Sequence, residues 1–211
     1  PCTLKDPDEV SIDIQEVVKE IVQTAELILY DDSFTDFESG WREYIDEESV
    51  IDWYLVNEFT KNNDAIFFTS VYMFYNPSDC KLHLGPNWDF DISCGNINYN
   101  DCDNPSGFYI KAAKWISCMF EDPVFVENVK SRWNEKKTEL QVIINSDLQQ
   151  LADDNTISAE YNFVKWRILG SYIWPNAAGY ELRTTYQSEI DYMEHWCNSR
   201  FSWLDWAINT L

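Results

Sequence analysis

Basic residues are scarce in this chain: 15 Lys and Arg stand against 37 Asp and Glu in 211 residues, a formal net charge of −22. Nucleic acids and anionic membrane surfaces are bound through basic patches, so we expect no nucleic-acid partner. The sequence also lacks any stretch of roughly 20 consecutive apolar residues, the length that a membrane-spanning helix needs, so we expect no membrane span. Free nucleotide phosphates should need a divalent cation to bridge them to so acidic a surface.

The cysteines lack the spacing of a structural zinc site. They lie at positions 2, 80, 94, 102, 118 and 197 and include no CxxC pair. An even number would allow up to three disulfides, and scattered buried thiols explain the same count equally well. The sequence leaves both alternatives open.

Apolar content is high, with 45% hydrophobic and 16% aromatic residues, so the chain should fold around a sizeable core. Apolar spacing and turn residues predict helices over residues 8–29, 47–60, 111–120, 123–151, 158–172 and 180–208. Two runs rich in β-formers, 67–75 and 81–89, predict one β-hairpin. Tryptophans 115, 133, 166, 196, 203 and 206 recur along the later helices and are expected in the core. The predicted class is therefore α+β and mostly helical.

Two features of the polar residues have simple interpretations. His83 alternates with Leu82 and Leu84, so it is expected to face solvent on a strand; a ligand role is the alternative. The run NDCDN at 100–104 loosely resembles a calcium loop, but it lacks the Gly and the distant Glu of an EF-hand.

The most unusual stretch is WDFD, with Asp89 and Asp91, because no Lys or Arg occurs between Gly85 and Tyr109. Asp64 precedes the first expected strand, and antiparallel pairing would bring it to the end of the hairpin that carries WDFD. Like charges so close either raise a pKa or bind a metal, and oxygen ligands beside Asn favour magnesium, manganese or calcium. The simpler alternative is that Asp89 caps a turn and Asp91 binds a loop amide.

The stretches DEESVIDWYLVNEFTKNNDA and FYNPSDCKLHLGPNWDFDISCGN resemble the CotH-type kinase family, named for a spore-coat protein. WISCMFEDPVFVENVKSRWNEKKTEL and HWCNSRFSWLDWAI are similar to the helical tail of that family. The resemblance runs from about Tyr44 to the carboxyl end, and GPNWDFD with its trailing GN is the specific marker. It implies a divergent protein-kinase-like carboxyl lobe over 44–211, whose β-hairpin carries WDFD, preceded by an amino-terminal helix and acidic linker over 1–43.

The resemblance also implies a site. By position, Asp64 resembles the catalytic acid that accepts or orients the substrate hydroxyl. Asp89 resembles the acid that holds the magnesium bridging the phosphates of ATP, with Asp91 as a second ligand. The implied cofactors are ATP and Mg²⁺ or Mn²⁺, and the implied partners are protein substrates with Ser or Thr hydroxyls. The implied location is extracellular, at a cell surface or in a spore coat.

The sequence departs from this pattern in ways that keep other interpretations open. HRD, DFG and a Gly-rich phosphate loop are absent, and residues 1–40 contain only Lys5 and Lys19 as bases. No counterpart of the phosphate-gripping Lys is evident, so the chain is either the carboxyl-terminal part of a longer kinase or a reduced relative. The alternatives are a non-catalytic surface or assembly module on the same scaffold, and a calcium-stabilised helical module.

Overall fold

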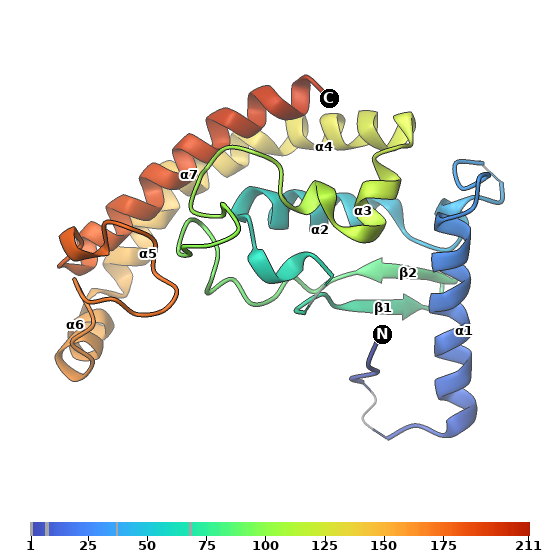
Figure 1. Cartoon of the computed structure of the whole chain (residues 1–211), viewed down its shortest axis with the longest axis horizontal. Helices are drawn as coiled ribbons and strands as arrows, with labels where there is room; N and C mark the ends of the chain where they lie inside the picture. The colour runs from blue at the N-terminus through green and yellow to red at the C-terminus, as the bar shows by residue number, and fades with distance from the viewer. Residues whose placement is uncertain (1, 7–8, 37, 68) are drawn as a thin grey trace.

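The computed structural model describes residues 2–6, 9–36, 38–67 and 69–211. In chain order the helices and strands are α1 (Ile12–Leu29), α2 (Glu47–Thr60), β1 (Met73–Asn76), β2 (Lys81–Leu84), α3 (Lys114–Met119), α4 (Pro123–Val142), α5 (Leu148–Asp154), α6 (Thr156–Lys165) and α7 (Tyr186–Asn209). The mostly helical α+β class with one antiparallel hairpin is confirmed (Figure 1). In the described part of the chain, no helix is long and apolar enough to cross a membrane.

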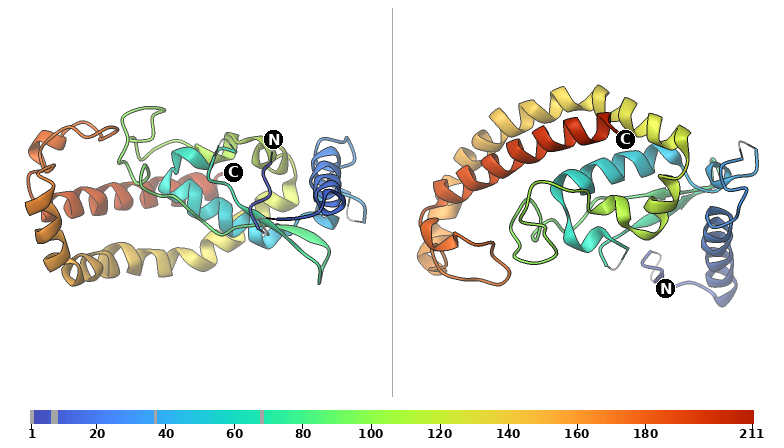
Figure 2. Two further views of the ribbon diagram at one scale, coloured as in Figure 1. Left: turned by 90° about the horizontal axis from the view of Figure 1, so that it is seen from below. Right: turned by 45° about the horizontal axis from the view of Figure 1, so that its top comes forward.

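The two longest carboxyl-terminal helices, α4 and α7, run alongside each other in opposite directions (Figure 2). α4 continues through a π-helical turn, Ile143–Asp147, into α5. One nearly continuous helix therefore covers the range 123–151 that the sequence predicts as helical. α2 contacts α4, α7 and β2 and forms the centre of the core. α1 lies at the opposite end of the molecule from α6 and contacts α3 (Figure 1).

α2 has the bounds that the sequence predicts, and its ends show why. The side chain of Asp46 accepts a hydrogen bond from the backbone N–H of Ser49 at 2.8 Å, which satisfies a free donor of the first turn. The helix ends at Lys61, whose backbone is left-handed with φ of 45°. Residues are buried on nearly all sides of the helix: Val50, Ile51, Trp53, Tyr54, Asn57, Glu58 and Phe59. This burial fixes the carboxyl end of α2 as the rigid base of the segments that follow.

The hairpin is shorter than expected. β1 and β2 pair in antiparallel register from Met73 opposite Leu84 to Asn76 opposite Lys81. Residues 69–72 are not strand, and the chain leaves the sheet at Leu84, so WDFD lies in irregular backbone beyond β2. The expectation that the hairpin itself carries WDFD is therefore wrong, because the hydrogen-bonded pairing of the two strands ends at Leu84, before WDFD begins.

His83 is half-buried between two carboxylates, and the expectation that it faces solvent is wrong. Its Nε2 lies 2.8 Å from Oδ2 of Asp79, and its Nδ1 lies 3.4 Å from Oδ1 of Asp46. The ring also stacks on Phe74 with a centroid separation of 5.0 Å. These contacts connect the hairpin to the N-cap of α2.

The tryptophan and helix-boundary predictions are correct only in part. Trp115, Trp133 and Trp196 are buried, but Trp166 and Trp206 are 55% and 64% exposed, so the prediction is wrong for those two. The helix expected over 158–172 is α6, which ends at Lys165. The helix expected from residue 180 begins at Tyr186, because Thr185 and Ser188 form a capping box there.

Asp122 connects the start of α4 to the segment before α2. Its carboxylate accepts hydrogen bonds from the backbone N–H of Val124 at 2.9 Å, from Trp41 Nε1 at 3.3 Å, and from Arg42. Burial raises the pKa of this carboxyl, but the hydrogen bonds, led by that from Arg42, outweigh it and leave the pKa lowered.

We therefore expect Asp122→Asn to lower the free energy of unfolding by about 1.5–3 kcal/mol at neutral pH, because a charge-assisted hydrogen bond is lost. A carboxyl with a depressed folded-state pKa contributes its stability above the unfolded-state value of about 4. That contribution is lost as the pH falls through the lower folded-state pKa. Urea unfolding of both proteins between pH 7 and about pH 3 measures the difference, and a difference that does not shrink below about pH 4 would contradict the assignment.

Candidate functional site

Asp64 lies in the short 3₁₀ turn Asn63–Ala65 that directly follows α2. The side chain of Asn62 caps this turn by accepting from the backbone N–H of Asp64 at 3.3 Å. Asn63 Nδ2 donates to Asp64 Oδ1 at 3.3 Å. Both asparagines are buried, whereas the Asp64 side chain is half-buried. The turn is thus fixed from inside and presents a carboxylate with solvent access.

Asp89 is exposed and sits in strained backbone. Its φ is 66°, in the left-handed region, and Oδ2 of its carboxylate accepts a hydrogen bond from Ser70 Oγ at 3.0 Å. Ser70 is also left-handed, with φ of 53°, as is Phe67 with φ of 60°. Non-glycine residues rarely adopt this conformation, and strained residues gather at functional sites.

The segment that carries WDFD docks on the carboxyl end of α2. Asn57 Nδ2 donates to Asn87 Oδ1 at 2.7 Å, and Asn62 Nδ2 donates to the carbonyl oxygen of Trp88 at 3.3 Å. Because Asn62 also caps the turn of Asp64, one side chain touches both acidic segments. The two acidic segments are therefore connected by asparagine side chains, without a ladder of strand hydrogen bonds.

Asp91 is exposed and follows Asp89 after one residue. Burial raises the pKa of the Tyr99 hydroxyl, and the negative charges of Asp64 and Asp91 raise it further. Both carboxylates thus act on the same ring. The structure brings the three acidic segments to one end of the molecule's hairpin region.

The three carboxylates do not form a closed metal cage. Within the described residues, no group of three or more His, Cys, Asp or Glu side chains is arranged to hold a metal ion, so the expected convergence of all three acids around one cation is not seen. Magnesium is commonly held by only one or two carboxylates together with the phosphates of its nucleotide. Asp89 and Asp91 have carboxylate oxygens, which are the type of ligand that magnesium prefers. In the described chain, neither they nor Asp64 form an ion pair. Asp89 and Asp91 thus offer exposed carboxylate oxygens of the kind that such a partial site uses.

A sequence model of the family described as CotH kinase protein matches residues 5–204. The chain belongs to the CotH kinase family. The matched range begins well before Tyr44, so it also includes α1, which the resemblance read from the motifs had left out. No curated protein sequence matches the chain.

Behind the acids, this CotH kinase family member has a buried charge cluster that sequence reasoning missed. Glu58 and Arg200 are each 0% exposed, and Arg200 Nη2 donates to Glu58 Oε1 at 2.7 Å. The carboxylate of Glu58 also accepts the backbone N–H groups of Tyr109 and Lys111, each at 2.8 Å. This pair fixes the end of the Asp- and Asn-rich loop that follows WDFD.

Arg200 holds the same loop through its backbone carbonyls. Its Nη1 donates to the carbonyl oxygens of Pro105 at 2.8 Å and Gly107 at 2.7 Å. Its Nε donates to the carbonyl oxygen of Phe59 at 3.2 Å, in the last turn of α2. Burial lowers the pKa of Arg200, and the charge of Glu58 opposes that effect. One guanidinium therefore connects α7, α2 and the loop.

The run 100–104 surrounds an ammonium group. Lys61 Nζ donates to the carbonyl oxygens of Asp101 at 2.8 Å, Asn104 at 2.9 Å and Ser106 at 2.6 Å. Lys61 is 2% exposed, and burial lowers the pKa of its amine. The carbonyls that a calcium ion would need are occupied by a side chain of the same protein, which removes the basis for interpreting this run as a calcium loop.

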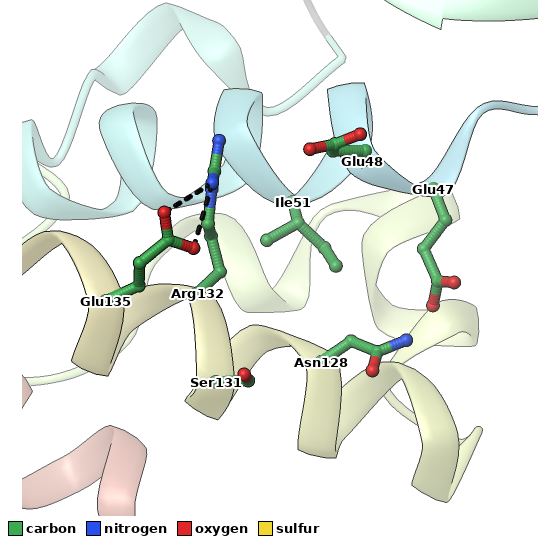
Figure 3. Close-up of a pocket in the computed structure, with 7 residues that line it drawn as sticks. All are labelled: Glu47, Glu48, Ile51, Asn128, Ser131, Arg132 and Glu135. Carbon is green, nitrogen blue, oxygen red and sulfur yellow. Dashed lines mark hydrogen bonds and ion pairs between the residues drawn. The ribbon is translucent and has the colours of Figure 1, made fainter.

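A groove of about 230 Å³ lies between α2 and α4 and contains none of the three acids. It is lined by Glu47, Glu48, Ile51, Asn128, Ser131, Arg132 and Glu135 (Figure 3). Arg132 forms ion pairs with Glu135 at 3.0 Å and with Asp52 at 2.7 Å, so its charge is already neutralised. The groove is a solvated ion-pair surface in this family member.

Proposed function

We propose that the chain forms the carboxyl lobe of an ATP- and magnesium-dependent protein kinase that phosphorylates Ser or Thr residues of secreted or spore-coat proteins. The observation that supports this proposal best is the docking of the WDFD segment against the Asn62–Asp64 turn. Through the side chain of Asn62 it joins the two segments whose acids resemble those of kinase motifs, and neither acid has a basic partner in the described chain. The lobe is assigned to residues 44–211, with residues 1–43 as a separate amino-terminal segment.

In this proposal Asp64 orients the substrate hydroxyl and accepts its proton. The Asn63 amide donates to one carboxylate oxygen, Oδ1, and the Asn62 cap fixes the backbone that carries the acid. A carboxylate held in this way can accept a hydrogen bond from an incoming hydroxyl with little loss of conformational entropy. The role of Asp64 is therefore to position the substrate hydroxyl and accept its proton.

Asp89 is proposed as the metal ligand, with Asp91 as a second ligand. The hydrogen bond from Ser70 fixes one oxygen of Asp89, and the left-handed backbone fixes the direction in which its side chain leaves the chain. When bound, Mg²⁺ or Mn²⁺ supplies positive charge that offsets the negative charge of the transferred phosphoryl group. The abundance of acids elsewhere makes such a bridging cation necessary for any nucleotide to approach.

The test is calorimetry of ATP binding with and without magnesium or manganese. We expect the unaltered chain to bind ATP only when the cation is present, and Asp89→Asn to abolish this binding. Asn suits the test because it tolerates the left-handed conformation of residue 89 and removes only the charge. Asp103→Asn is the matched control, since it removes one charge from an exposed residue of the neighbouring loop.

Equal magnesium-dependent binding by the unaltered chain and by Asp89→Asn would remove Asp89 from the metal site. If the control variant lost binding to the same extent, net charge would be the cause in place of ligation. Absence of any binding to the unaltered chain would contradict nucleotide binding by this lobe.

A second candidate function, a non-catalytic surface or assembly module, is favoured by one surface. None of the described residues of α6 is buried, and its Ile157, Tyr161 and Val164 are 69%, 76% and 73% exposed. Trp166, the residue after the helix, is also exposed, at 55%. Exposed apolar patches of this kind mark protein–protein contacts. A binding module predicts no magnesium-dependent heat with ATP, so the same calorimetry separates the two functions.

A further inference from the structure

The segment that carries Cys94 lies against the turn of α7 that carries Cys197, although 103 positions separate the two cysteines in the sequence. Cys94 lies in the WDFDISCGN segment, and Cys197 lies in α7 among the buried core residues. Arg200, three residues after Cys197, donates to the carbonyl oxygen of Phe59 at 3.2 Å, and the next carbonyl, that of Thr60, accepts the backbone N–H of Cys94. All six cysteines are free thiols in this structure.

The backbone around Cys94 is held against α7 by neighbouring contacts. Tyr192 Oη donates to the carbonyl oxygen of Gly95 at 2.9 Å. A Cβ atom at Gly95 would lie only 2.4 Å from Cδ1 of Trp196, so residue 95 must be glycine to approach α7 this closely. On the other side, the backbone N–H of Cys94 donates to the carbonyl oxygen of Thr60 at 2.8 Å. The position of Cys94 beside the turn of α7 that carries Cys197 is thus set by packing on both sides.

The other four cysteines have different surroundings. Cys102 is buried, and its sulfur lies against Asn63 and Asn100. Cys80 is exposed and donates to the carbonyl oxygen of Pro77. Cys2 is exposed and Cys118 is half-buried, and both are free thiols. Within the described chain, Cys94 and Cys197 therefore form the sulfur pair that geometry favours for oxidation.

Cys94 is also the better nucleophile of the pair. The hydrogen bond from the Cys197 thiol lowers the pKa of Cys94, and the positive charge of Arg200 acts in the same direction. The same hydrogen bond and burial raise the pKa of Cys197. Because the thiolate is the reactive form, attack should begin at Cys94.

We propose that Cys94 and Cys197 form a disulfide bond under oxidising conditions, which fastens the segment after WDFD to α7. A small-molecule disulfide supplies the oxidising equivalents. The Cys94 thiolate attacks one of its sulfurs and releases one small thiol, and the Cys197 thiolate then attacks Cys94 in the mixed disulfide and releases the second. Two protein thiols are oxidised, their two protons pass to the small thiols, and the small disulfide is reduced.

The experiment uses the whole chain equilibrated with glutathione disulfide, then denatured, alkylated with N-ethylmaleimide, digested and analysed by mass spectrometry. We expect a cross-linked peptide pair containing Cys94 and Cys197, two mass units lighter than the sum of its reduced halves. The melting temperature of the oxidised protein should rise by about 5–10 °C, because the bond constrains a long stretch of chain in the unfolded state.

Cys94→Ser and Cys197→Ser should each lose the cross-link and the rise in melting temperature, whereas Cys118→Ser should keep both. The peptide map of the unaltered chain needs no variant, so the proposal stays testable if a substitution at the buried Cys197 prevents folding. Alkylation of both Cys94 and Cys197 after oxidation, or a cross-link between other cysteines, would overturn it. The bond does not depend on kinase activity.

Discussion

Asp64→Asn is expected to lower kcat for phosphoryl transfer by about 10²–10⁴-fold, the contribution of a general base, with the affinity for magnesium and ATP nearly unchanged. The substitution keeps the shape of the side chain and its place beside Asn63, but it removes the charge that accepts the proton. An effect on kcat alone distinguishes a group that acts on the hydroxyl from one that holds the nucleotide.

The measurement is transfer of labelled phosphate from ATP to a mixed Ser/Thr peptide library, with calorimetry of nucleotide binding in parallel. The matched control is Asp103→Asn, which removes one charge from a neighbouring exposed position. An unchanged transfer rate in Asp64→Asn would exclude Asp64 as the base. A rate of zero in the unaltered chain, together with no magnesium-dependent nucleotide binding, would favour the binding-module function.

Arg200→Met is expected to reduce the free energy of unfolding by about 3–5 kcal/mol, because it leaves the carboxylate of Glu58 buried without its counter-ion. It also removes the donors to four backbone carbonyls, those of Glu58, Phe59, Pro105 and Gly107. In a chain of this size, the loss corresponds to a fall in melting temperature of roughly 6–20 °C. Urea and thermal unfolding measure it.

Arg132→Met is the matched control on α4. Its guanidinium pairs with Asp52 and Glu135 at the surface, where such pairs contribute about 0–1 kcal/mol. Equal losses for the two variants would show that the buried pair has no special role. The double variant Glu58→Gln with Arg200→Met should recover part of the loss, since the isolated buried charge is then absent.

Local signals in the sequence explain the parts of the fold that could be predicted. Asp46, which caps α2, and the polar residues after Thr60 give the bounds of that helix correctly. Turn residues between two runs of β-formers give the hairpin, but strand length depends on pairing partners, and the pattern could not show that pairing stops at Leu84. Likewise, Trp166 is as apolar as Trp133, and only the absence of a covering element leaves it exposed.

The candidate site, too, could be predicted only in part. Sequence order was enough to infer that the segments carrying Asp64 and WDFD lie close together. The contacts between them come from asparagine side chains and not from the paired strands that the prediction assumed. The cluster of Glu58, Lys61 and Arg200 was missed, because 142 positions separate the two partners of its ion pair. A Lys at a helix end is ordinarily a solvated residue, so no local pattern indicates that Lys61 is buried.

The ammonium of Lys61 has a consequence for where this protein can work. A bound ion leaves when its concentration falls, whereas a group tethered to the backbone has a fixed, very high local concentration around the three carbonyls that it satisfies. The loop beside the acids should keep its shape in chelator-treated or mineral-poor surroundings as well as in mineral-rich ones. The chain has thus made one structural cation part of its own sequence, and in the proposed function only the cation beside WDFD binds and leaves with the nucleotide.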